Sequence, residues 1–185
     1  MKSIMKTSML VFAAILMLAP PLKAIDVPIN IRGRIHLPPC KINNDSDFKV
    51  EFGKISLQEI DGNKFYKSVS VTVHCDYFQG KPYIHLSGGT GGIPGAPDNV
   101  LNTTGANPSA LGIALYHGDS IDTNYPLRLG AGINGQFGHE ITKGLSIKNA
   151  QVSQYTFSAV PYKIKNTDLI AGAFTASVTM SISYQ

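Results

Sequence analysis

Residues 172–185 constrain the fold of this chain most strongly. Every second side chain in this segment is apolar, and the side chains between them are threonine or serine. Because successive residues of a β-strand point to opposite faces, this alternation predicts a strand with one face in a hydrophobic core. We expect the chain to end on this core strand, which then needs a partner. The apolar positions are Phe174, Ala176, Val178, Met180, Ile182 and Tyr184.

A second alternating run lies near the other end of the chain, where polar Asn30, Arg32 and Arg34 separate the positions Val27, Ile29, Ile31, Gly33 and Ile35. An exposed strand edge is an aggregation hazard, and a strand from another chain can cover it. We interpret the first run as a strand that needs a partner strand. We interpret the second run as a strand that this chain donates to another chain. Two alternatives stay open: an ordinary sheet strand for the first run, and the opening strand of a closed sandwich for the second.

The first 24 residues have the pattern of a secretory signal peptide. Lys2 and Lys6 precede an apolar run from Met9 to Leu18, and Ala24 is a suitable small residue for cleavage. The run is too short to span a bilayer comfortably, so we expect no stable membrane insertion. Cleavage after Ala24 would leave 161 residues, a length that suits one domain with a real core.

Charge and cysteine content narrow the class further. The signal region contains three of the 16 basic residues and none of the 12 acidic ones, so the mature net charge is +1. The remaining basic residues are scattered, which argues against a nucleic-acid partner. Cys40 and Cys75 are the two cysteines, and an exported chain is expected to oxidise such a pair. A disulfide of this spacing would stabilise the fold by roughly 3 to 4 kcal/mol.

Short apolar or alternating runs bounded by turn residues recur after residue 25, and helical periodicity is hard to find. The sequence predicts an all-β Greek-key sandwich of the immunoglobulin type, with one possible helical turn at Leu57–Ile60 and a flexible glycine- and proline-rich loop at 88–107. Cys40 closes the first predicted strand and Cys75 the strand beside it, so the bridge would tie neighbours. The predicted strands are Ile29–Ile42, Phe48–Phe52, Ser68–Cys75, Pro82–Ser87, Ala110–Tyr116, Gln154–Tyr162 and Ala173–Tyr184.

Catalytic and cofactor patterns are weak. The glycines at 88–92 lack the spacing and the Lys-Ser/Thr pair of a phosphate-binding loop. The five histidines lie apart in sequence without ligand spacing, and no metal site is predicted. The run 117–120 contains His, Asp and Ser in one turn, where a triad geometry is hard to reach. We therefore expect no enzyme and no cofactor.

A secreted sugar-binding module is an alternative from another functional class. In that reading the loops 88–107 and 130–138 would form the site, and aromatic side chains would supply stacking faces. The candidate aromatic residues are Tyr83, Tyr125 and Phe137.

The chain resembles the pilin subunits of chaperone-usher pili. Gly172, fourteenth from the end, and Tyr184, the penultimate residue, match the C-terminal motif of that family, and Cys40 and Cys75 match its disulfide. The run Asp26–Gly33 resembles its N-terminal donor extension. The runs 29–33, 38–40 and 112–116 are similar to minor tip subunits of such pili.

This resemblance implies three parts: a signal peptide at 1–24, a donor-strand extension at 25–36 and a pilin domain at 37–185. It implies a sandwich that lacks its last strand and is completed by a donor strand from another chain. The groove strand would comprise Gly172, the six apolar residues from Phe174 to Tyr184, and Gln185.

The resemblance also implies the partners. A periplasmic chaperone would fill the groove first, and its basic residues would hold the Gln185 carboxylate. At the outer-membrane usher, the extension of an incoming subunit would replace the chaperone strand. Val27, Ile29, Ile31 and Ile35 would enter the groove of the subunit ahead, with Gly33 where two backbones approach closely. The expected role is an adaptor between the tip adhesin and the fibre, with a shaft or terminator subunit as the alternative within the family.

Overall fold

The computed structural model describes residues 28–33, 35, 37–132 and 137–185. The chain divides into two units, Met1–Ile35 and His36–Gln185, which are described separately. The expected signal peptide and Val27 lie outside the described residues. In the first unit, residues 28–33 and 35 have no regular secondary structure. The predicted strand Ile29–Ile42 is therefore wrong over most of its length, and only Lys41–Ile42 (β1) pairs with another strand.

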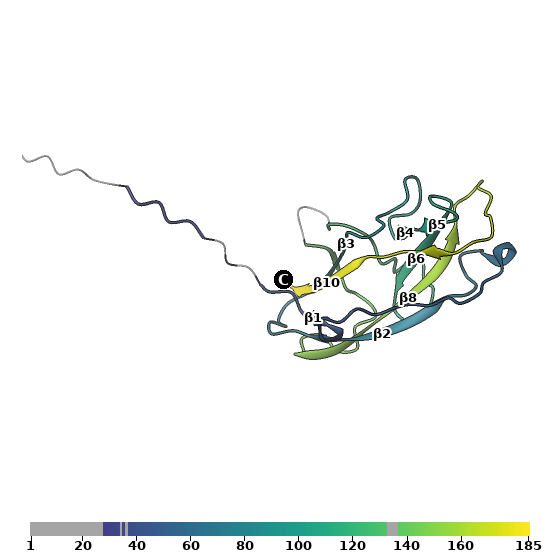
Figure 1. Ribbon diagram of the computed structural model, residues 1–185. Helices are drawn as coiled ribbons and strands as arrows, with labels where there is room; N and C mark the ends of the chain where they lie inside the picture. Colours follow the sequence, from purple (N-terminus) through teal and green to yellow (C-terminus); the bar gives the residue numbers. More distant parts are fainter. Residues whose placement is uncertain (1–27, 34, 36, 133–136) are drawn as a thin grey trace, which may run out of the picture. The chain divides into compact units, whose positions relative to one another are not determined.

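The second unit contains two main antiparallel sheets (Figure 1). The larger sheet has the order β1-β2-β8-β6-β4, and the smaller has the order β10-β3-β7. A separate pair joins β5 to β9. The bounds of the larger sheet are β1 (Lys41–Ile42), β2 (Lys67–His74), β8 (Val152–Lys163), β6 (Leu111–His117) and β4 (Val100–Asn102). Those of the others are β3 (Pro82–Ser87), β7 (His139–Glu140), β10 (Thr179–Tyr184), β5 (Thr104–Gly105) and β9 (Phe174–Thr175).

Alternating sequence places the core between the sheets. In β2, Val71 and Val73 are buried while Ser70 and Thr72 point to solvent, as the period of two requires. Strand β6 is buried along its whole length. Its second face packs in a smaller cluster together with Ile93 from the 88–99 region, which explains why β6 reads as a continuous apolar run. The main core comprises residues of both sheets, including Ile84, Leu86, Tyr155, Phe157, Ile182 and Tyr184.

Four strand predictions agree closely with β2, β3, β6 and β8, and the helical turn at Leu57–Ile60 is confirmed as a 3-10 turn, Leu57–Glu59 (η3). A second 3-10 turn, Asn43–Asp45 (η2), follows β1. Two other predictions need correction. Residues 48–52 form no strand, because they have no hydrogen-bonded neighbour among the described residues. The loop 88–107 contains β4 and β5, and its Ile93 and Val100 are buried.

The strand order identifies the architecture. An immunoglobulin sandwich has strands A, B, E and D in one sheet and C, F and G in the other. Here β1, β2, β8 and β6 follow the order A-B-E-D, while β3 and β10 occupy the places of C and F. No strand of the described residues lies on the far side of β10, where G belongs. The predicted incomplete sandwich that lacks its last strand is confirmed.

Candidate functional site

One edge of β10 is open. Its other edge pairs with β3 from Thr179 to Tyr184. On the open side, the only backbone hydrogen bond in the described part of the chain runs from the Cys40 amide to the Ile182 carbonyl, at 2.7 Å. Alternate residues of a strand direct their main-chain groups to the same side. Val178 and Met180 therefore direct theirs to the open side, in step with Ile182.

The facing wall of this opening is the segment 46–55. Val50 and Phe52 pack on the main core and are half-buried. The ring of Phe52 lies 6.3 Å from that of Phe174, measured between centroids. Between residues 47 and 55 no backbone hydrogen bond is formed within the described ranges. We call the space between this segment and residues 174–182 the acceptor groove: among the described residues, neither the segment 47–55 nor the open side of Val178 and Met180 makes a backbone hydrogen bond.

The floor of the acceptor groove consists of core side chains that remain partly open to water. Phe174, Ala176, Val178 and Met180 are only half-buried, whereas the polar residues Thr175, Ser177 and Thr179 between them are exposed. The predicted alternation is thus confirmed, with a break in strand pairing at 176–178. Ile182 and Tyr184 are fully covered. The hydrophobic driving force therefore favours an apolar strand in this groove.

A pocket of about 310 Å³ adjoins the groove at Val178. Leu86, Leu101 and Leu129 contribute its apolar walls, and glycines supply much of the rest. An added Cβ at Gly91 or Gly130 would meet no atom within 4 Å, so the pocket is wide because these positions carry no side chain. Its apolar lining suits hydrophobic side chains of an incoming strand.

The first half of the C-terminal segment is held in place by contacts on the side away from the acceptor groove. The side-chain amide of Asn107 donates to the Ile170 carbonyl and accepts from the Ile170 amide, both at 2.8 Å. A Cβ at Gly172 would collide with the Cβ of Ala106, so only glycine fits there. Farther along, the amide of Thr90 donates to the Ser177 carbonyl at 3.0 Å. The predicted groove residue Gly172 thus allows this segment to pass close to Ala106, and it does not line the floor of the acceptor groove.

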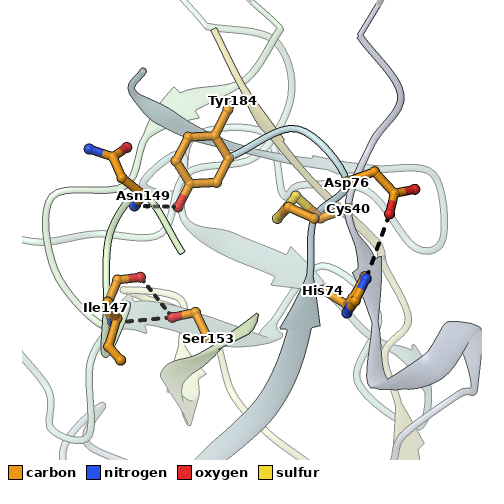
Figure 2. The surroundings of a disulfide bond; sticks show 8 residues. Cys40, His74, Asp76, Ile147, Asn149, Ser153 and Tyr184 are labelled. Atoms are coloured by element: carbon orange, nitrogen blue, oxygen red, sulfur yellow. Dashed lines mark hydrogen bonds and ion pairs between the residues drawn. A yellow bond between two sulfur atoms is a disulfide. The ribbon is translucent and has the colours of Figure 1, made fainter. Parts of the chain in front are cut away.

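The disulfide lies beside the end of β10, where the Cys40 amide donates to the Ile182 carbonyl; Figure 2 shows its surroundings, including Tyr184. Cys40 and Cys75 are bonded, and they flank the paired strands β1 and β2. The prediction that the bridge ties neighbouring strands is confirmed. Gln185 exchanges two backbone hydrogen bonds with Lys81, each of 2.9 Å, so it extends the pairing of β10 with β3.

The predicted donor residues lie in the first unit. Ile29, Ile31 and Ile35 are 83%, 91% and 104% exposed. Nothing in the described residues approaches a Cβ built at Gly33. Apolar side chains at this level of exposure remain hydrated, so the hydrophobic effect favours burying this alternating segment elsewhere. Val27 lies outside the described residues.

The run at 117–120 is no catalytic site. Nδ1 of His117 lies 2.7 Å from the Tyr155 hydroxyl in the core. Burial, with a smaller contribution from nearby His139, lowers the pKa of His117 to about 4, and burial raises the pKa of Tyr155. Asp119 and Ser120 are exposed and make no hydrogen bond to His117 in the described structure. Within residues 28–33, 35, 37–132 and 137–185 no group of three metal-binding side chains occurs.

Two of the three aromatic residues predicted for sugar stacking, Tyr125 and Phe137, are exposed, and each contacts one neighbouring side chain. Tyr83 is buried, so that part of the prediction is wrong. The Lys143 ammonium lies over the Tyr125 ring at 4.8 Å, and Phe137 packs edge-on against His85. Residues 133–136 of the second proposed loop lie outside the described residues.

Two sheets in the A-B-E-D and C-F order, a disulfide at the first strand pair and an open groove beside F define the class: an incomplete immunoglobulin-like sandwich of the kind found in pilus subunits. The family model described as "Fimbrial protein" matches residues 29–185, and the chain belongs to this family. A fimbrial protein is a structural component of a surface pilus and not an enzyme. No helix in the described residues has the length and apolar character to cross a membrane.

Curated relatives from Escherichia coli include the minor fimbrial protein PrsF and the fimbrial adapter PapF. Each is 36% identical to this chain over 159 residues, which cover 86% of this chain and 88% of the relative. The fimbrial-like protein YfcR of Escherichia coli strain K12 is 30% identical over 149 residues, which cover 80% of this chain and 74% of that protein.

Solved structures agree with this assignment. The P pilus adaptor subunit PapF is 26% identical with a TM-score of 0.53, and the match covers 82% of this chain and 100% of that chain. The P pilus rod subunit PapA is 20% identical with a TM-score of 0.55 over 80% of this chain and 100% of that one, which shows the fold alone.

Sequence reasoning missed three features of the groove. It treated 48–52 as a strand, although this segment makes no backbone hydrogen bond among the described residues and its Val50 and Phe52 pack on the main core. It also gave no role to Asn107 or to Thr90. Their contacts join segments more than 60 residues apart, and no local pattern signals them.

Proposed function

We propose that this chain is a minor structural subunit of a chaperone-usher pilus, an adaptor that links the tip adhesin to the fibre by donor-strand exchange. The acceptor groove carries this proposal: a half-buried apolar floor between two walls of unpaired main chain calls for one more strand. The adaptor role rests on the likeness to PapF and PrsF, which are named as adapter and minor fimbrial protein.

The chain would take part in two joints. Its groove receives a strand, and residues 25–36 are lent to the groove of another subunit. Burying four aliphatic side chains of the extension would stabilise that joint by very roughly 6 to 12 kcal/mol before ordering costs. Each strand-pairing hydrogen bond adds a net contribution of about 1 kcal/mol. Such a joint dissociates slowly without a covalent link.

The order of partners follows from the hazard of an open groove. After export, a periplasmic chaperone fills the groove with one of its own strands, because an uncovered apolar edge aggregates. At the outer-membrane usher, the extension of another subunit replaces that strand. The finished joint lies in the pilus on the cell surface.

Val178 offers the sharpest test of the groove. We expect Val178→Asp to lower chaperone capture by at least about 100-fold, because an unpaired carboxylate would have to be buried under the incoming strand. The matched control is Thr179→Asp, next along the strand but with its side chain exposed on the other face. Co-purification of the chaperone with each variant measures the effect. Equal recovery of both complexes would contradict the groove assignment.

The adaptor role is tested by position in the fibre. Immunogold labelling of this subunit should mark the fibre tip, at about one site per pilus, and deletion of its gene should separate the adhesin from otherwise normal fibres. Labels along the shaft would instead identify a shaft subunit.

A further inference from the structure

The end of β10 is connected to a turn that takes no part in the groove. Asn149 lies in this turn, between Leu145, which bridges to Tyr155, and the start of β8. Its backbone amide donates a hydrogen bond to the Tyr184 hydroxyl at 3.2 Å (Figure 2). The Tyr184 ring itself is buried in the core. The hydroxyl is thus the point where the end of β10 contacts this turn.

The side chain of Asn149 reaches a third segment. With Nδ2 facing the loop before β3, its amide donates to the Gly80 carbonyl at 2.9 Å and to the Phe78 carbonyl at 3.2 Å. The next residue in that loop, Lys81, is the one that pairs with Gln185. Asn149 has a φ of 56°, a left-handed conformation that asparagine tolerates. One residue therefore joins the turn, the loop and the end of β10.

These contacts form a closed circuit with the disulfide. The Cys75 amide donates to the Gln151 carbonyl at 2.8 Å, two residues from Asn149. Cys40, bonded to Cys75, donates to the Ile182 carbonyl. The circuit runs from β10 through the disulfide to the turn and back to β10 at Tyr184. These contacts do not use the main-chain groups of Val178 and Met180 on the open side. The circuit can therefore order the strand without occupying the groove.

We propose that Asn149 is a positioning residue for strand capture. It holds Tyr184 and the last residues of β10 in strand geometry before any partner arrives, so that the incoming strand meets a preformed edge. Preorganisation of this kind lowers the ordering cost of association. Once the partner strand is seated, it orders the edge itself, and the contribution of Asn149 becomes small. This inference rests on the proposed function and assigns a residue to its first step.

Asn149→Gly is the test variant, because glycine keeps the left-handed backbone and the amide donor but removes the bridge to Gly80 and Phe78. Asn166→Gly is the matched control: Asn166 is exposed, has a φ of 59° and makes no side-chain hydrogen bond within the described structure. The refolding chain is mixed with the periplasmic chaperone of its own pilus system. Capture of Asn149→Gly should be about five- to tenfold slower than capture of the control. The finished complexes of both variants should melt at the same temperature.

Tyr184→Phe supplies a second variant that keeps the buried ring and removes only the accepting hydroxyl. It should slow capture by itself and slow it further in the Asn149→Gly background, because the two changes break different hydrogen bonds of Asn149: the amide bond to the Tyr184 hydroxyl and the side-chain bridge to Gly80 and Phe78. Equal capture of the two glycine variants would overturn the inference, as would a parallel loss of capture rate and complex stability, which indicates a merely structural role. Absence of any capture of the unsubstituted chain would overturn the proposed function and this inference with it.

Discussion

At the scale of single residues, His117 shows how a buried polar group makes stability depend on pH. Its ring lies in the core beside Tyr155, and burial lowers its pKa from 6.5 to about 4. The unfolded chain therefore binds a proton below about pH 6.5, whereas the folded chain binds it only near pH 4. Since the unfolded state holds more protons in that window, stability falls as the pH drops through it.

We expect this histidine to cost about 3 kcal/mol of folding free energy between pH 6.5 and pH 4. His117→Asn should flatten that dependence, because asparagine offers Tyr155 an acceptor that does not titrate. The melting temperature of the chaperone-bound chain, measured across this pH range for both proteins, tests the effect. Parallel curves for the two proteins would refute the assignment to His117.

Individual residues also show what sequence could and could not reveal. The alternation from Phe174 to Tyr184 predicted which side chains face the core, because a period of two follows from strand geometry alone. Tyr83 also lies in a predicted strand, but its side chain is buried, so it offers no face for sugar stacking. Asn149 gave no signal, since its partners Tyr184, Gly80 and Phe78 lie far away in sequence.

At the scale of elements, the acceptor groove explains why the strand predicted at residues 48–52 is absent. A strand is defined by its hydrogen-bonded neighbours, and the structure supplies none for this segment in its described part. Apolar side chains of this segment do pack on the core, but no neighbouring strand pairs with its main chain. The strands of the loop 88–107 were missed for a different reason: β4 and β5 are three and two residues long, and their pairing is set by contacts with β6 and β9.

The donor extension is tested by Gly33→Leu. In this chain a Cβ at position 33 meets nothing in the described residues, so the substitution has no local steric cost. Chaperone capture through the groove should therefore stay normal. Docking of the extension into another subunit should fall by at least about tenfold, because a leucine would separate backbones that must approach closely.

The control for this prediction is Asn30→Leu, which adds the same side chain on the opposite side of the alternation. Both variants are compared by the rate at which the extension, as a peptide or in the whole chain, displaces the chaperone from a neighbouring subunit. Equal loss of chaperone capture and docking in Gly33→Leu would contradict the donor role.

At the scale of the whole molecule, the described residues of the sandwich supply six of the seven immunoglobulin strands and a disulfide between the first two. The fold class could be predicted because turn signals, strand alternation and cysteine placement are local. Which edge stays open could not be read from periodicity, since an ordinary edge strand has the same pattern as β10. The strand order decides it, because the free side of β10 is the place of strand G.

Co-expression of the mature chain with and without its periplasmic chaperone tests the central claim most directly, with the mass of the purified species measured by light scattering. The account predicts a one-to-one complex with the chaperone and, without it, aggregation or degradation. A stable, soluble monomer that unfolds in one cooperative transition would show that the sandwich closes unaided and would contradict the account.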